Sequence, residues 1–211
     1  MKILITSGGT REYLDDVRVL TNISSGKLGS IIADKLMESV NEIHYVTTKS
    51  SFLPKNNNKL IIHYVTNVQS VYDTMKELVP DMDVVIHSMA VSDFGFKPTG
   101  KKIKSDDIDG FIDTLKSTIY KTPKILSYIK NWNPNTYLIS FKFEVGKNYN
   151  ELIDIAYDSL IKNGCDLVVA NDKKEMKNKN SHVAYIIDNN KNVISCSDKE
   201  DIATKIKNYM N

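Results

Sequence analysis

The sequence predicts an α/β protein of the Rossmann-like, doubly wound class, with one mostly parallel sheet and an added C-terminal β-hairpin. Short β-branched apolar stretches alternate with amphipathic helical patterns along most of the 211 residues, which indicates parallel strands joined by helices. The tail departs from this alternation, because residues 182–196 form two β-type runs around an Asn-rich turn. No repeat or linker divides the chain, so residues 1–211 are expected to form a single domain.

Six apolar stretches of strand length define the expected sheet. They are residues 2–7, 42–48, 60–66, 83–88, 136–141 and 166–170. Helices are expected between them and at the end of the chain, with Ser25 as the N-cap of the first and Pro123 in the first turn of the third. These helices are residues 25–40, 68–79, 123–132, 150–163 and 199–210. The longest irregular stretch, 90–109, is expected to be functional because long loops in compact domains usually are.

Composition excludes several classes of protein. Hydrophobic residues make up 41% and charged residues 26%, as in ordinary globular proteins, and no apolar run approaches the roughly 20 residues of a membrane span. The 28 basic residues nearly balance the 26 acidic ones, so no nucleic-acid surface is expected. A strand begins at once after Met1 with no leader pattern, which favours a cytoplasmic protein. Cys165 and Cys196 are expected to be reduced, the histidines are too dispersed for zinc, and His87 is read as a core residue.

Glycines follow the first strand and open the first helix. Gly8, Gly9 and Thr10 could place backbone N–H groups against an anion, although a plain tight turn is equally compatible with them. Ser25, Gly26 and Lys27 do not fit the phosphate-loop motif, since Thr21 stands where its first glycine should be. They could still form an anion site at a helix N-terminus together with Asn22, but local reasoning favours a helix cap alone.

A basic loop follows the fourth strand. Asp93 lies near the expected mouth of the sheet, where its carboxylate could hold a magnesium ion carried by nucleotide phosphates. Lys97, Lys101, Lys102 and Lys104 follow it and could close over a triphosphate, while a solvated basic loop is the simpler interpretation. A nicotinamide cofactor is disfavoured because the chain lacks the G-x-G-x-x-G pattern.

Several motifs, in order and at characteristic spacing, resemble those of the phosphopantothenate-cysteine ligases (phosphopantothenoylcysteine synthetases) of coenzyme A biosynthesis, in their stand-alone bacterial form. These are TSGGTREYLDDVRVLTNISSGKLG, HSMAVSDF, Lys102-Ile103-Lys104, TPKIL, ISFKFE and CDLVVANDK. The resemblance implies a homodimeric ligase that uses CTP, or ATP, to convert 4'-phosphopantothenate to an acyl-nucleotidylate. L-cysteine then displaces the nucleotide to form an amide, and Mg2+ accompanies the nucleotide. An activated acyl group is needed because a carboxylate is a poor acyl donor.

The resemblance also implies roles for individual residues. Asn22 and Lys102 are catalytic, and Arg18, Asn22, Met89 and Ala90 bind the substrate, Arg18 reaching its phosphate across a dimer interface. Nucleotide contacts are implied for Asp93, Pro123, Lys124, Ile125, Leu126 and Phe141, in addition to the glycine-containing segments above.

The chain departs from the family pattern at three places. It reads Ser-Met-Ala-Val-Ser-Asp at 88–93 where members often have Asn-Ala-Ala-Val-Ala-Asp, and Lys-Ile-Lys-Ser at 102–105 where they often have Lys-x-Lys-Lys. It also has Lys142 where the fused bacterial forms have alanine. These departures bear on the nucleobase preference more than on the reaction. A non-catalytic nucleotide-binding module on the same fold and a Rossmann-type reductase are the alternatives, and the joint presence of Asn22, Asp93 and Lys102 argues against the first of them.

Overall fold

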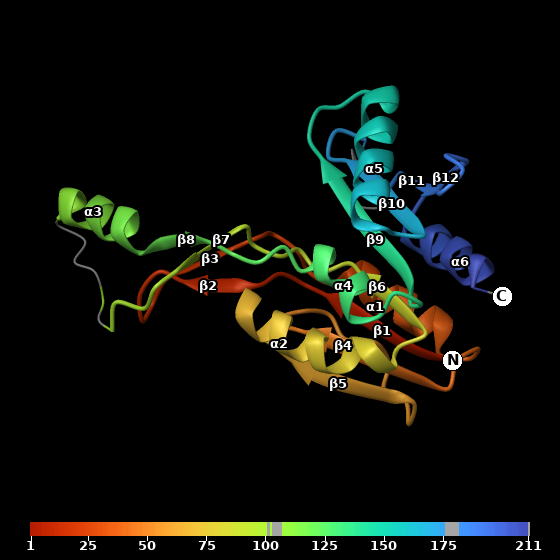
Figure 1. Ribbon diagram of the computed structural model, residues 1–211, viewed down its shortest axis with the longest axis horizontal. Helices are drawn as coiled ribbons and strands as arrows, with labels where there is room; N and C mark the ends of the chain where they lie inside the picture. Colours follow the sequence, from red (N-terminus) through yellow and green to blue (C-terminus); the bar gives the residue numbers. More distant parts are fainter. Residues whose placement is uncertain (101, 103–106, 176–181, 211) are drawn as a thin grey trace.

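An eight-stranded sheet forms the body of the protein, and a long arm extends from it (Figure 1). The computed structural model describes residues 1–100, 102, 107–175 and 182–210. The strand order is β12-β11-β10-β9-β6-β1-β4-β5. Neighbouring strands in the part of the sheet that runs β10-β9-β6-β1-β4-β5 are parallel. β11 and β12 are antiparallel additions at the β10 edge. The predicted fold class and C-terminal hairpin are therefore confirmed.

All six strands predicted for the sheet body are present, with ends that differ by at most a few residues. They are β1 (Lys2–Ser7), β4 (Glu42–Thr47), β5 (Leu60–Tyr64), β6 (Val84–His87), β9 (Tyr137–Glu144) and β10 (Leu167–Asp172), and the hairpin is β11 (Ala184–Asp188) and β12 (Val193–Cys196). Side chains of neighbouring residues alternate between the two faces. Ile3 and Ile5 accordingly pack on one face and Leu4 on the other, all fully buried.

Helices cover both faces of the sheet, which is the doubly wound arrangement (Figure 1). One face carries α1 (Lys27–Leu36) and α6 (Lys199–Tyr209), and the other carries α2 (Val68–Leu78), α4 (Leu126–Trp132) and α5 (Tyr149–Asn163), with the short η1 (Val79–Asp81) after α2. Asn67 and Asn148 form capping boxes at the starts of α2 and α5. Gly164, at φ 62°, ends α5 in the left-handed conformation that glycine adopts without strain.

The arm was not predicted. It consists of β2 (Arg11–Tyr13), β3 (Val19–Thr21), β7 (Phe94–Phe96), α3 (Ile108–Thr118) and β8 (Ile119–Lys121). β2 pairs with β3 and β7 pairs with β8, both antiparallel, and the far end of the arm is α3 (Figure 1). The stretch 90–109, expected to be irregular, therefore contains β7 and the start of α3. α3 has no buried residue, and strands of three residues are too short to show a period.

Two predicted helix starts were wrong. Gly26, not Ser25, is the N-cap of α1, at φ 75°, and it makes no side-chain capping hydrogen bond. α1 begins at Lys27, two residues after the predicted start, and ends at Leu36 rather than at residue 40. Pro123 lies before α4, which begins at Leu126, because the backbone N–H of Thr122 is held by the Asp93 carbonyl at 3.1 Å and the chain there is still extended.

Candidate functional site in the crevice between β1 and β6

The chain changes direction across the sheet at β1, and in open α/β sheets the ligand crevice is expected at such a point. The crevice therefore means here the carboxyl ends of β1 and β6 with the segments that follow them, residues 8–10 and 89–91. The segments that follow these two strands are bound to each other. The Ala90 N–H donates to the Gly8 carbonyl at 2.8 Å, and the Thr10 N–H donates to the Ala90 carbonyl at 3.2 Å. Gly8, Gly9, Thr10 and Met89 are buried and Ala90 is half-buried. The structure thus brings these five predicted site residues together.

Gly8 and Gly26 approach each other closely because neither has a side chain. A Cβ on Gly26 would lie 3.2 Å from the Gly8 nitrogen and 3.0 Å from the Ser7 Oγ. A Cβ on Gly8, which has φ +87°, would collide with the Ser51 hydroxyl. The first turn of α1 therefore lies against the turn after β1. A helix N-terminus packed against a glycine turn is an arrangement that anion sites use.

Asn22 joins the crevice from the segment after β3. Its Nδ2 donates to the Val91 carbonyl at 3.2 Å, while the residue as a whole stays exposed. The neighbouring Thr21 hydroxyl donates to the Thr10 carbonyl at 2.7 Å, which anchors this segment to the turn after β1. Val91 lies directly after the Met89–Ala90 pair, so Asn22 is positioned by the same backbone that closes the crevice.

Asp93 lies at the outer end of the crevice with its side chain exposed. The Thr122 hydroxyl donates to the Ser92 carbonyl at 2.5 Å, and the Ser92 N–H donates to the Thr10 Oγ1 at 3.0 Å, so the backbone before Asp93 is well fixed. Among the described residues no group of three potential metal ligands occurs. A single exposed carboxylate fits a Mg2+ ion that keeps its waters and arrives with nucleotide phosphates.

The residues predicted to hold the nucleotide base and ribose are not all on one side of the sheet. Ile125, only 1% exposed, and Leu126 pack into the core under α2, α4 and α5. Phe141 packs on the opposite face, with the core under α1 and α6. Pro123 is half-buried and Lys124 is exposed. The side chains of Ile125 and Phe141 are therefore not brought together, and Ile125 has only its backbone to offer a ligand.

Two other predicted site residues lie in or next to the arm. Arg18 forms an ion pair with Asp15, with 3.2 Å between Nη1 and Oδ2, and its guanidinium lies 5.7 Å from the centre of the Phe111 ring of α3. Lys102 is exposed and makes no hydrogen bond or ion pair with another described residue. Lys101 and Lys104 lie outside the described residues.

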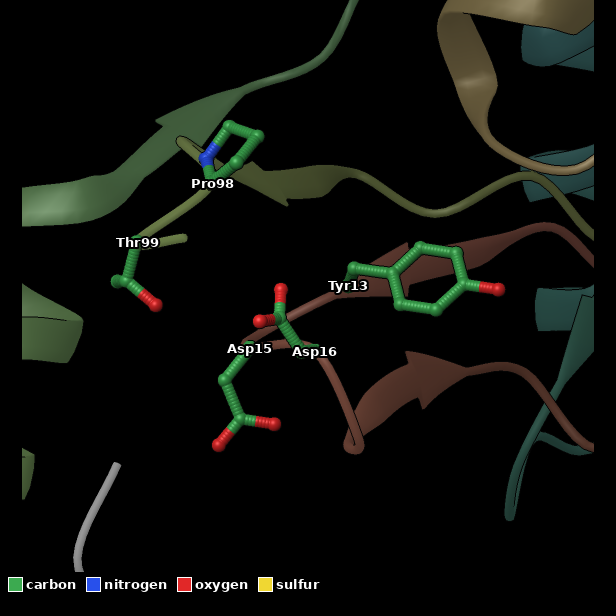
Figure 2. A pocket seen from close by; sticks show the side chains of 5 residues that line it. All are labelled: Tyr13, Asp15, Asp16, Pro98 and Thr99. Atoms are coloured by element: carbon green, nitrogen blue, oxygen red, sulfur yellow. The ribbon is translucent and has the colours of Figure 1, made fainter. Parts of the chain in front are cut away.

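The arm contains a cavity of about 310 Å³ that the sequence did not predict, and Figure 2 shows the side chains that line it. It is lined by Tyr13 at the end of β2, by Asp15 and Asp16 from the turn that follows, and by Pro98 and Thr99 from the turn after β7. Asp15 is 2% exposed and accepts hydrogen bonds from the backbone of Val17 and Arg18. The sequence shows two adjacent aspartates at 15–16, but no pattern around them indicates that residues 98–99 lie opposite.

His87 is a buried polar residue beneath the crevice, as its interpretation as a core residue predicted. It ends β6 at 8% exposure, and its Nδ1 lies 2.8 Å from the Thr6 Oγ1. Burial lowers the pKa of His87 to about 4, so the ring is neutral near pH 7. Thr6 was not among the predicted site residues, since a threonine inside an apolar strand carries no signal by itself.

The chain has clear relatives. The model of the family described as "DNA/pantothenate metabolism flavoprotein C-terminal domain" matches residues 1–211. The chain is 34% identical over 187 residues to the coenzyme A biosynthesis bifunctional protein CoaBC of Thermococcus kodakarensis, covering 88% of this chain and 44% of that protein. It is 32% identical over 175 residues to the protein of the same name from Vibrio vulnificus, covering 81% of this chain and 41% of that one.

Solved structures agree with these matches. The crystal structure of the DNA/pantothenate metabolism flavoprotein from Streptococcus pneumoniae superposes with a TM-score of 0.88 at 35% identity, over 100% of this chain and 98% of that one. A C-terminal domain of CoaBC superposes at 0.77 with 24% identity over 99% and 93% of the two chains, which supports the fold. The chain spans less than half the length of the CoaBC relatives. From the match over its whole length, the chain belongs to the family of the DNA/pantothenate metabolism flavoprotein C-terminal domain.

Proposed function

We propose that the chain is the ligase that joins 4'-phosphopantothenate to L-cysteine in coenzyme A biosynthesis, as one nucleotide-binding domain over residues 1–211. One observation carries the proposal: a family match over the whole chain coincides with a crevice at β1 and β6 in which Asn22 contacts the Val91 carbonyl. The relatives are named for coenzyme A biosynthesis, and joining these two compounds is the ligase step that the sequence motifs imply.

The proposed reaction has two steps. A carboxylate oxygen of 4'-phosphopantothenate attacks the α-phosphorus of the nucleoside triphosphate, and pyrophosphate leaves. The cysteine amine then attacks the carbonyl carbon of the acyl-nucleotidylate, loses a proton, and displaces the nucleoside monophosphate. The mixed anhydride provides the leaving group that a free carboxylate lacks.

Crevice residues suit this chemistry. The Asn22 amide, held by Val91, has an oxygen that remains to accept a hydrogen bond from the acyl intermediate. Backbone N–H groups at the start of α1, near Gly26 and Lys27, favour an anion such as the phosphate being transferred. Lys102 is assigned to the charge that develops during nucleotidyl transfer.

CTP is the proposed nucleotide, with ATP as the alternative. Mg2+ would be held by Asp93 together with the nucleotide phosphates, where it supplies positive charge to the triphosphate. A homodimer and a cytoplasmic location belong to the same proposal. The exposed apolar side chains of the arm support the dimer, including Val17 at 63% exposure and Ile108 at 71%, because large exposed apolar surfaces mark contact sites. Among the described residues no helix is long and apolar enough to cross a membrane.

A coupled assay tests the function. Purified chain is mixed with 4'-phosphopantothenate, cysteine and Mg2+, with CTP or ATP in turn, and pyrophosphate and amide product are measured separately. We expect both products with CTP. Nucleotide binding without either product, with both nucleotides, would favour the alternative of a non-catalytic module.

Asn22→Asp tests the residue assignment in the same assay. The added negative charge would repel the anionic phosphate of the intermediate, so amide formation should fall much more than pyrophosphate release. Asn56→Asp, in the exposed polar loop at 54–59, is the matched control and should change neither. Equal loss of both products, or of neither, in Asn22→Asp would contradict the role of Asn22.

A further inference from the structure

A buried hydrogen-bond chain runs from His87 to the turn after β6. Thr6 in β1 and His87 in β6 are register partners in adjacent parallel strands. The Thr6 Oγ1 lies 2.8 Å from the His87 Nδ1 and accepts a hydrogen bond from the Met89 N–H at 3.2 Å. Thr6 is fully buried and His87 nearly so. A single hydroxyl therefore connects the imidazole to the backbone of the crevice.

The directions of these hydrogen bonds follow from counting the available hydrogens. The Thr6 hydroxyl has one hydrogen, and its oxygen already accepts from the Met89 N–H. Among the described residues, the His87 Nδ1 is the only acceptor within reach of that hydrogen. The hydroxyl therefore donates to Nδ1, and the His87 proton resides on Nε2. The lowered pKa of His87, caused by burial, agrees with this neutral form.

The same turn is held at further points on its way to Asn22. The Ser88 hydroxyl donates to the Thr6 carbonyl at 2.6 Å, and the Ala90 N–H donates to the Gly8 carbonyl at 2.8 Å. One residue further on, the Val91 carbonyl accepts from the Asn22 side chain. A shift at Met89 would therefore be passed along two residues to the partner of Asn22.

We propose that His87 is a positioning residue for the ligase reaction: through the Thr6 hydroxyl it holds the Met89–Val91 backbone, and with it Asn22, in the geometry that amide formation needs. The proposal rests on the proposed function. His87 itself touches no substrate in this scheme. Its contribution is to supply a neutral nitrogen acceptor at one position, which neither an apolar side chain nor an imidazolium can do.

The test uses two pairs of variants in the full chain. Thr6→Val and His87→Leu remove the hydroxyl and the acceptor, while Thr6→Ser and His87→Asn retain a hydroxyl and a δ-position acceptor. We expect kcat to fall about 10- to 100-fold in the first pair with KM changed less than about threefold, because small displacements of reacting groups reduce rates strongly. The second pair should keep kcat within about threefold. The Thr6→Val/His87→Leu double variant should be no slower than the slower single variant.

Hydrogen exchange and ¹⁵N NMR separate this proposal from the function itself. The Met89 amide should exchange faster in Thr6→Val and His87→Leu but not in Thr6→Ser, and ¹⁵N shifts should show the His87 proton on Nε2. These readouts do not need an active enzyme, so an inactive wild type would refute the function and leave the hydrogen-bond chain to be judged by NMR. The proposal is overturned if the proton is on Nδ1, if the conservative variants are as slow as the others, or if all four variants change only thermal stability.

Discussion

Replacing Gly8 by alanine is expected to damage both the stability of the protein and its crevice. Gly8 has φ +87°, and a Cβ there would meet the Ser51 Oγ and lie 3.0 Å from the Ser51 Cβ. The Ser51 hydroxyl is itself held by the Thr48 Oγ1 at 2.8 Å. An alanine must therefore adopt a left-handed backbone and also displace a side chain that is fixed by a hydrogen bond.

These two effects can be estimated separately. The left-handed conformation costs a non-glycine residue about 1–2 kcal/mol. Displacing Ser51 loses a hydrogen bond, about 1 kcal/mol, and crowding against the Ser51 Cβ adds about 1–2 kcal/mol. Gly100→Ala is the matched control, since Gly100 has φ +67° but a Cβ there would meet nothing within 4 Å. Gly8→Ala should thus lower the free energy of unfolding by about 3–5 kcal/mol and Gly100→Ala by only about 1–2 kcal/mol.

Urea denaturation of the two variants and of the Gly8→Ala/Ser51→Gly double variant measures the cost of the left-handed backbone and the cost of the contact with Ser51 separately. Removing the Ser51 side chain should recover about 1–3 kcal/mol of the loss, measured as a coupling free energy against Ser51→Gly alone. Ligase activity should fall in Gly8→Ala, while Gly100→Ala, in the loop that carries Lys102, serves as a control for stability alone. Equal destabilisation by the two alanines, or no coupling between positions 8 and 51, would refute the account of this turn.

Three further predictions concern charge, packing and pH. Lys102→Gln should lower kcat by about 100-fold or more with a small change in KM. Lys162→Gln, exposed on α5, is the control and should behave as wild type. Equal kcat values for the two variants would contradict the role of Lys102. Ile129→Ala, at a fully buried position, should cost about 2–5 kcal/mol in urea denaturation, against less than about 0.5 kcal/mol for Ile161→Ala at 57% exposure. Because the folded pKa of His87 is lowered from 6.5 to about 4, its stabilisation is complete above pH 6.5 and is lost as the pH falls to 4. Between pH 6.5 and pH 4 the free energy of unfolding should therefore fall by about 3 kcal/mol more in the wild type than in His87→Asn. Parallel curves of unfolding free energy against pH for the two proteins would contradict the burial of a neutral ring.

The body of the fold was predictable because its elements carry strong local patterns. β1 and β10 each contain a short apolar run, Ile-Leu-Ile and Leu-Val-Val-Ala. The amphipathic helices between the strands repeat their buried positions, as Leu152, Ala156 and Leu160 do in α5. The arm was missed for the opposite reason. Its strands have three residues each, so none of them shows a pattern of its own. β7 and β8 pair across 23 to 27 residues, as Phe96 does with Ile119 and Phe94 with Lys121, while β2 and β3 pair across a short turn. A segment of three residues contains no pattern that predicts which strand it pairs with.

The candidate site was predictable in part. The rule that ligands lie at the carboxyl ends of strands, together with the family motifs, predicts Gly8, Asn22 and Ala90 as site residues, and the structure brings them next to one another. The prediction of Ser25 as the N-cap of α1 was wrong, because Gly26 adopts a positive φ and occupies the N-cap position itself. The Thr6–His87 link joins residues 81 apart in the sequence, so only the register of β1 with β6 could reveal it.

An oxygen-transfer experiment tests the proposed reaction most directly. 4'-Phosphopantothenate labelled with ¹⁸O in its carboxylate is incubated with the chain, cysteine, Mg2+ and CTP, and the products are analysed by mass spectrometry. An acyl-nucleotidylate requires one labelled oxygen to be carried away on the phosphate of CMP when the amide forms. We predict ¹⁸O in CMP and none in pyrophosphate. Label in inorganic phosphate instead, or CTP turnover with unlabelled CMP and no amide, would contradict the account.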